Sequence, residues 1–81
     1  MQLEIITPDG KAFAGEVSMA TFPGTDGSFQ VLENHAPLIA ALQRGPVRYR
    51  SAEGERTVTV DGGVVEVLNN RVVVLAEAIV K

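Results

Sequence analysis

Turn-forming residues recur about every 8 to 12 positions along this chain, and short runs rich in valine, isoleucine and threonine lie between them. Such residues suit a pleated, half-buried surface. Several runs alternate: Leu3 and Ile5 share one face with Glu4 opposite, and residues 47–50 direct Arg48 and Arg50 outward. This spacing leaves little room for long helices and predicts an all-β sandwich or barrel.

The turns themselves can be located from residue type. Residues 7–10 (Thr-Pro-Asp-Gly) indicate a tight turn, because proline presets φ and glycine accepts positive φ. Residues 23–27 indicate a loop. The Asp61-Gly62 pair is a strong hairpin signal and predicts separate strands at 56–60 and 64–68.

Two segments are open to two interpretations. Residues 38–43 favour helix by their alanine and leucine content, but the run is short and is enclosed by Pro37 and Pro46. Residues 72–76 are apolar at every position. That final strand is therefore either buried on both faces or has one face that meets another protein.

Length and charge exclude several classes of function. With 81 residues the chain predicts a single domain over residues 1–81. Seven lysines and arginines against ten acidic residues give a net charge of −3, which argues against binding nucleic acid or an anionic membrane. Cysteine is absent, so disulfides and thiolate metal sites are excluded. Neither a membrane-spanning run nor a basic leader is visible, so we expect a soluble intracellular protein.

Catalytic machinery is not apparent in the sequence. His35 is the single histidine, the serines lack a nucleophile-elbow context, and Asp9, Asp26 and Asp61 stand apart from other carboxylates. We therefore expect a structural or interfacial His35, no enzyme activity, no metal and no cofactor. The residues alone indicate a small acidic interaction domain. A free-standing module that binds a small ligand or carbohydrate is the alternative, although tryptophan is absent.

Three segments, taken in order, resemble one family. The first is Leu-Glu-Ile-Ile-Thr-Pro-Asp-Gly at residues 3–10, and the second runs from Pro23 through His-Ala-Pro-Leu at residues 35–38. The third is Gly-Gly-Val-Val-Glu-Val at residues 62–67, followed by Val-Val-Val-Leu-Ala at residues 72–76. In combination they resemble the N-terminal domain of the epsilon subunit of F-type ATP synthase over nearly the whole chain.

The resemblance implies a fold and a role. The fold would be a flattened two-sheet β-sandwich of about ten short strands, with residues 38–43 extended. The role would be that of a non-catalytic rotor subunit of a proton- or sodium-translocating ATP synthase, peripheral on the cytoplasmic face of the bacterial inner membrane. It would touch the membrane only through the c-ring. From the apolar runs at residues 72–76 and 38–42 we expect an apolar face that gamma covers. The resemblance places Thr7, His35 and Ala40 at the gamma subunit, and Asp26, Gly27 and Ser28 at the c-ring.

The chain departs from the family pattern in two places. Family members commonly have Pro-Gly before His-Ala-Pro-Leu, whereas this chain has Glu33-Asn34, which adds a negative charge. Asn34 tolerates a left-handed backbone, so the turn is expected to survive. The family's C-terminal helical hairpin is not seen before Lys81, and we expect a naturally short form.

Overall fold

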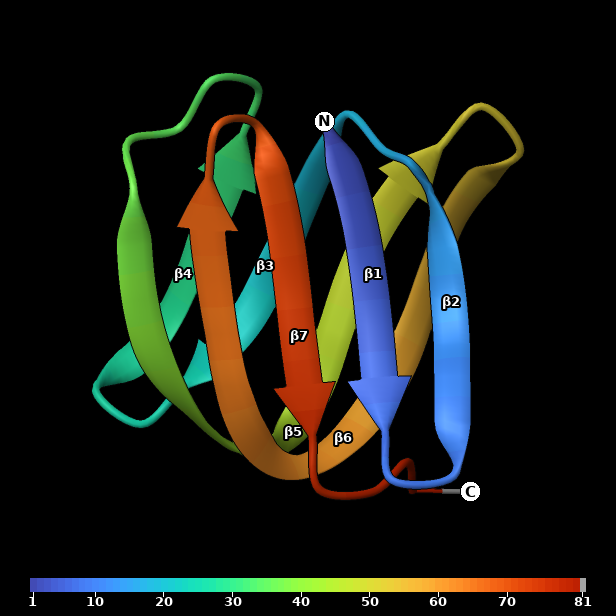
Figure 1. The fold of residues 1–81 in the computed structure, drawn as a ribbon, viewed down its shortest axis with the longest axis vertical. Helices are drawn as coiled ribbons and strands as arrows, with labels where there is room; N and C mark the ends of the chain where they lie inside the picture. Colours follow the sequence, from blue (N-terminus) through green and yellow to red (C-terminus); the bar gives the residue numbers. More distant parts are fainter. Residues whose placement is uncertain (81) are drawn as a thin grey trace.

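The computed structural model describes residues 1–80, and every regular element in that range is a β-strand. This confirms the all-β prediction. No helix in this range is long and apolar enough to cross a membrane. The strands, shown in Figure 1, are β1 (Gln2–Thr7), β2 (Gly10–Glu16), β3 (Met19–Gly24), β4 (Gly27–Leu32), β5 (Leu38–Ser51), β6 (Gly54–Leu68) and β7 (Arg71–Ala76).

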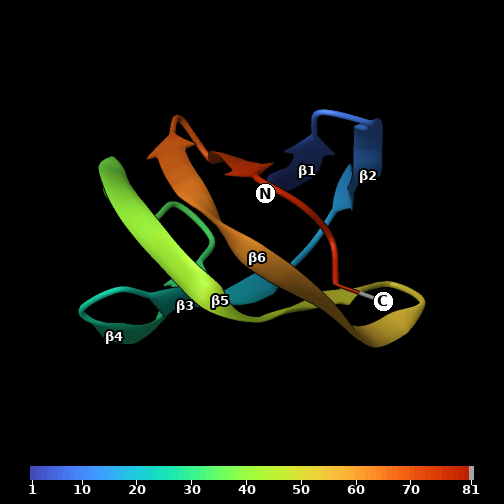
Figure 2. The same cartoon turned by 90° about the horizontal axis from the view of Figure 1, so that it is seen from below.

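The strands form one mixed sheet, in the order β2-β1-β7-β6-β5-β3-β4, which folds over on itself. Figure 2 shows β5 and β6 passing from one layer to the other. The first layer contains β2, β1, β7, residues 63–68 of β6 and residues 38–42 of β5. The second layer contains the remainder of β6 and β5, with β3 and β4. The two long strands, β5 and β6, each contribute a segment to both layers. The sandwich is therefore built from seven strands, whereas the resemblance implied about ten shorter ones.

The hairpin predicted at Asp61-Gly62 is wrong, because β6 continues through these residues. Its pairing with β5 keeps the same register on both sides, from Arg44 opposite Asp61 to Leu42 opposite Gly63. Gly62 and Gly63 have φ values of 82° and 144° and bend the strand instead of reversing it. A Cβ on Gly63 would collide with the carbonyl oxygen of Leu75, so the close approach of β7 also requires glycine there.

Residues 38–43 are extended and form the first half of β5. They pair with β6 from Leu38 opposite Val67 to Leu42 opposite Gly63. Leu42 is buried and Leu38 is half-buried, so the segment contributes to the core in strand geometry. This tertiary pairing outweighs the helix propensity of its alanines, which is a fraction of a kcal/mol per residue (~0.5).

The loop predicted at residues 23–27 is shorter than expected. Pro23 and Gly24 belong to β3, Gly27 begins β4, and only Thr25 and Asp26 form the turn. Gly24 pairs with Gly27, and a Cβ on Gly24 would lie 2.6 Å from the Gly27 carbonyl oxygen. The backbone N–H of Thr25 donates to the carbonyl of Ala41, 3.0 Å away, which ties this hairpin to β5.

The space between the two layers is filled by buried apolar side chains from every strand except β2, which contributes the half-buried Phe13, and no polar side chain is buried among the described residues. Val72 and Val74 of β7 and Leu3 and Ile5 of β1 are fully buried. Two aromatic pairs close the sides of this core: the ring centroids of Phe13 and Tyr49 are 4.4 Å apart, and those of Phe22 and Phe29 are 5.5 Å apart. These rings are used within the fold.

Candidate functional site: an exposed apolar face

The outer surface of the first layer is unusually apolar. Large hydrophobic side chains project from it although the alternation of each strand would allow polar residues. We call this surface the apolar face; its members are Ile6, Ile39, Val64, Leu68 and Leu75. Ile39 is 72% exposed and Leu75 is 55% exposed. Contiguous apolar surface of this kind marks a site of interaction with another molecule.

The strand register brings three of these residues, Ile6, Leu75 and Val64, into one row. Ile6 is opposite Leu75, Leu75 is opposite Val64, and Val64 is opposite Ala41. The row therefore crosses four neighbouring strands, β1, β7, β6 and β5. It also resolves the two interpretations of residues 72–76: their inward side chains fill the core, and their outward side chains, led by Leu75, are left on the surface.

Charges interrupt the apolar face at two positions. The carboxylate of Glu4 forms two ion pairs, one with Lys11 Nζ at 2.9 Å and one with Arg71 Nη2 at 3.1 Å. The hydrogen bond from Lys11, followed by that from Arg71, lowers the pKa of Glu4. Glu66 is exposed between Val73 and Ile39, and no cation within residues 1–80 pairs with it.

The outer surface of the second layer has a different character. Arg48 and Arg50 project from β5, and both pair with Glu55 of β6, at 3.6 Å and 3.2 Å. Thr21 and Thr57 lie opposite Arg48 on the two neighbouring strands. Apart from Leu32 on the edge strand β4, which is 52% exposed, this surface is mostly polar and partly neutralised by its own ion pairs, as expected for a face turned to water.

Of the residues assigned to the gamma subunit by resemblance, Thr7 and His35 lie far apart. Thr7 ends β1 at the lower end in Figure 1, whereas His35 lies in the 33–37 connection at the upper end. The Thr7 hydroxyl donates to the carbonyl of Gly10 at 3.1 Å and accepts from the Asp9 N–H at 3.2 Å, so it closes the predicted turn. Thr7 also lines a shallow hollow with Ile6 and Leu75, at the margin of the apolar face.

Ala40, the third of these residues, lies on the opposite side of β5 from the apolar face. It is half-buried and packs against the core, opposite Val65. It shares a shallow hollow with Asp26 and Gly27 of the β3–β4 turn. The structure thus brings Ala40 close to residues assigned by resemblance to the c-ring. Asp26, Gly27 and Ser28 are all exposed at the tip of that hairpin.

His35 makes a local contact within the 33–37 connection. The Nδ1 of His35 lies 2.7 Å from the carbonyl oxygen of Ala36, to which it donates in the matching tautomer. Within residues 1–80, no three His, Asp or Glu side chains gather in a way that could hold a metal ion. The aromatic rings pair with one another, so little ring surface is left to stack on a sugar.

The members of the apolar face were only partly visible in the sequence. The apolar runs at residues 72–76 and 38–42, the second of which contains Ile39, indicated a face that a partner covers, but Val64 and Leu68 were not singled out. Which residues belong to the apolar face depends on which strands are neighbours and in what register they pair. One of these pairs, β1 with β7, is parallel and joins residues from opposite ends of the sequence. A hydrophobic residue at an outward position of three separate strands was the available signal.

Comparisons with known proteins give the family. The family model described as "ATP synthase, Delta/Epsilon chain, beta-sandwich domain" matches residues 1–81. The ATP synthase epsilon chain of Pelotomaculum thermopropionicum is 47% identical over 77 residues, covering 95% of this chain and 58% of that protein. The epsilon chain of Chlorobium limicola is 43% identical over 77 residues, covering 94% of this chain and 88% of that protein. The chain thus spans between about three fifths and nine tenths of these relatives.

Solved structures share the fold. A chain in the central stalk and c-ring structure of Tetrahymena thermophila mitochondrial ATP synthase aligns over 100% of this chain and 66% of its own length, with a TM-score of 0.85 and 17% identity. A chain of the Euglena gracilis mitochondrial ATP synthase aligns over 96% of this chain and 51% of its own, with a TM-score of 0.88 and 21% identity. By the family match, the identity to curated epsilon chains and this fold, the chain belongs to the delta/epsilon family of ATP synthase β-sandwich domains.

Proposed function

We propose that this chain is a non-catalytic rotor subunit in the central stalk of an F-type ATP synthase. In that role it binds the gamma subunit, rests on the c-ring and couples ring rotation, driven by proton or sodium flow, to ATP synthesis. It is peripheral to the membrane, on the cytoplasmic face, and reaches the membrane through the ring. Membership of the family supports the proposal, and the exposed apolar face is the structural observation that carries it.

In this proposal the gamma subunit covers the apolar face. Burying these five aliphatic side chains, of which four are now exposed and Ile6 is half-buried, would supply a substantial hydrophobic driving force, about 25 cal/mol for each Å² of apolar surface removed from water. Glu66 would then meet a basic side chain of gamma, because an unpaired carboxylate in a covered interface is costly. Thr7 and His35 would contact gamma at the two ends of that face.

The β3–β4 turn is the proposed contact with the c-ring. Asp26 and Ser28 are exposed at its tip, and the hydrogen bond from Thr25 to Ala41 ties the hairpin to β5. A single exposed ion pair from Asp26 to a ring loop contributes only about 0–1 kcal/mol. The turn would therefore act on the rotational register through repeated contacts and would add little to affinity.

The direct test is calorimetric titration of this chain with the gamma subunit of the same organism. Saturable one-to-one binding with a negative heat-capacity change is expected, because apolar surface becomes buried. Absence of binding to gamma, alone or in the catalytic head, would overturn the proposal. Co-purification of the chain with the assembled membrane complex is the supporting cellular result.

A further inference from the structure

Glu66 places a charge within the apolar face. It is exposed on β6, opposite Ile39 of β5 on one side and opposite Val73 of β7 on the other. The next outward residues along β6 are Val64 and Leu68, one on either side of Glu66. Aliphatic side chains therefore surround the carboxylate on this surface. A partner that covers these aliphatic neighbours also covers the carboxylate, and must pair with it to avoid a large desolvation cost.

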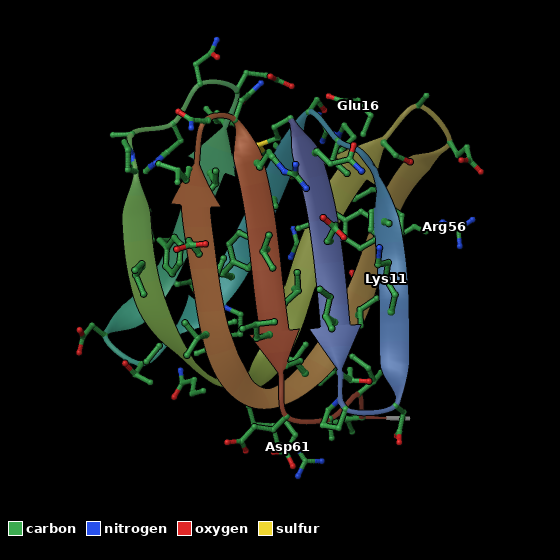
Figure 3. All side chains as sticks on the ribbon, viewed as in Figure 1. Lys11, Glu16, Arg56 and Asp61 are labelled. Carbon is green, nitrogen blue, oxygen red and sulfur yellow. The ribbon has the colours of Figure 1, made fainter. Side chains whose placement is uncertain are left out.

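Glu4, another carboxylate on the outer surface of this layer, has its charge matched within the chain. It lies opposite Val73 on β1, and it forms ion pairs with Lys11 at 2.9 Å and with Arg71 at 3.1 Å. Figure 3 labels Lys11 on β2, at the side of the first layer away from β5. Glu66 forms no ion pair within the part of the chain that the structure describes. The face thus has one end whose charges neutralise one another and one end with a carboxylate that a partner can reach.

A shallow hollow lies beside Glu66, and we call it the β5–β6 hollow. It is formed where β5 begins and β6 ends, and Glu66 is the one charged residue in a lining that is otherwise apolar. The lining residues are Pro37, Leu38, Ile39, Glu66, Val67 and Leu68. Ile39 and Leu68 are 72% and 48% exposed, so a side chain from another protein can reach both of them. The hollow therefore offers a hydrocarbon surface together with a single carboxylate.

Lysine and arginine side chains have the chemistry that matches this lining. Their methylene stems pack along apolar surface while the charged head stays at a polar group. A stem laid across Ile39 and Leu68 would bury hydrocarbon, and its head would meet the carboxylate of Glu66. An aliphatic side chain in the same place would leave that carboxylate desolvated and unpaired, which is costly. An acidic side chain would add repulsion between like charges.

The place of this charge on the face bears on how a partner is oriented. Hydrophobic attraction is non-directional, so an apolar surface by itself does not select one orientation of the protein that covers it. Glu66 lies on β6, whereas the neutralised group of Glu4, Lys11 and Arg71 lies on β1, β2 and β7. A cation of the partner can therefore meet Glu66 in one orientation, and it meets a neutralised group when the partner is reversed. Charged groups in interfaces fix register and exclude wrong arrangements in this way.

We propose that Glu66 and the β5–β6 hollow bind one lysine or arginine side chain of the gamma subunit, and that this contact fixes the orientation in which gamma lies on the apolar face. The inference rests on the proposed function, because gamma is the partner that it names. Ile39 and Leu68 hold the stem of the bound side chain, and the carboxylate of Glu66 accepts hydrogen bonds from its head. The other aliphatic residues of the face supply affinity, whereas Glu66 supplies specificity.

The first test is calorimetric titration of gamma with the variants Glu66→Gln and Glu66→Leu. Both are expected to weaken affinity at least about tenfold, because each leaves the cation of gamma buried without its partner. The leucine variant is the sharper one: if the hollow received an aliphatic side chain, a more apolar face would bind gamma more tightly. Glu53→Gln, at an exposed carboxylate in the 51–54 turn, makes the same change in net charge and should alter affinity by less than about threefold.

The second test changes each lysine and arginine of gamma to glutamate in turn. One reversal should weaken binding to the unchanged chain at least about a hundredfold, and Glu66→Lys should restore the affinity of that variant to within about tenfold. Carbodiimide coupling then separates the two residue types, since Glu66 forms an amide with a lysine and none with an arginine. Undiminished affinity in both Glu66 variants, or no reversal rescued by Glu66→Lys, would overturn the inference and leave the proposed function standing. Failure of the unchanged chain to bind gamma would overturn both.

Discussion

The two outer surfaces of this sandwich are built from the same alternating strands, yet they differ in composition. The apolar face carries Ile39, Leu75 and their neighbours, whereas the second layer presents Arg48 and Arg50 paired with Glu55. A sheet whose outer surface faces water normally alternates apolar and polar residues, as the second layer does. In the first layer, neighbouring strands carry apolar residues at outward positions, which indicates a surface that another protein covers.

Substitution at the bend of β6, where the strand passes between the layers, should have the largest effect on the free energy of unfolding. Gly63→Ala should destabilise the fold by more than about 3 kcal/mol, because its Cβ would collide with the Leu75 carbonyl and its φ of 144° is strained for alanine. Gly54→Ala is the control: its φ of 115° is also unfavourable, but its Cβ would meet open space, so a smaller loss of about 1–2 kcal/mol is expected. Urea unfolding of both variants makes the measurement. Equal losses would mean that strain alone, without the approach of β7, accounts for glycine at residue 63.

A charge introduced on the apolar face should weaken binding to gamma, whereas the same charge on the outer surface of the second layer should not. Leu75→Asp is expected to weaken affinity for gamma at least about a hundredfold, because an unpaired carboxylate would be desolvated in the interface. Its effect on folding should stay within about 1 kcal/mol, since Leu75 is 55% exposed. Thr57→Asp places the same charge on the second layer and should bind gamma as the unchanged chain does. Similar affinities for the two variants would remove the apolar face as the gamma site.

Ala40 is a poorer position for that experiment. Its side chain packs against the core, so Ala40→Asp would disturb the fold together with any interface. Ile39, its neighbour, is 72% exposed on the apolar face and repeats the Leu75 test on another strand.

A charge reversal in the β3–β4 turn tests whether this turn, which belongs to neither outer surface, contacts a second partner, the c-ring. Asp26→Lys should change stability by less than about 0.5 kcal/mol, because the residue is exposed in a turn. In an assembled enzyme in vesicles, it should lower proton pumping per ATP hydrolysed. Glu53→Lys, in the turn at the other end of the sandwich, is the control for charge reversal. Full coupling in the Asp26 variant, together with no cross-link from a cysteine at residue 28 to the ring, would contradict the contact.

The ion pairs of the second layer should have the smallest effect. Glu55→Gln removes both pairs, yet all three side chains are substantially exposed, so a loss of about 0.5 kcal/mol is expected, decreasing with added salt. Affinity for gamma should be unchanged. A loss of gamma binding in this variant would show that the polar surface, and not only the apolar one, contacts the partner.

Local patterns predicted much of the strand structure. Alternation in residues 2–7 correctly placed Leu3 and Ile5 on one face, which the structure buries, and the 7–10 turn forms where proline and glycine indicated it. The Asp61-Gly62 signal was misleading, because glycine with positive φ serves a bend within a strand as well as a reversal between strands. Propensity could not assign residues 38–43, whose extended form depends on β6.

The sequence by itself determined the fold class, the family and the suspicion that the last strand has an uncovered face, since each depends on residue types in order along the chain. Only the tertiary structure decided which residues make up that face and that Ala40 lies off it. The reason is physical: β1 pairs in parallel with β7, and β5 and β6 serve both layers. These long-range pairings set which side chains become neighbours, and a local pattern carries no information about register between distant strands.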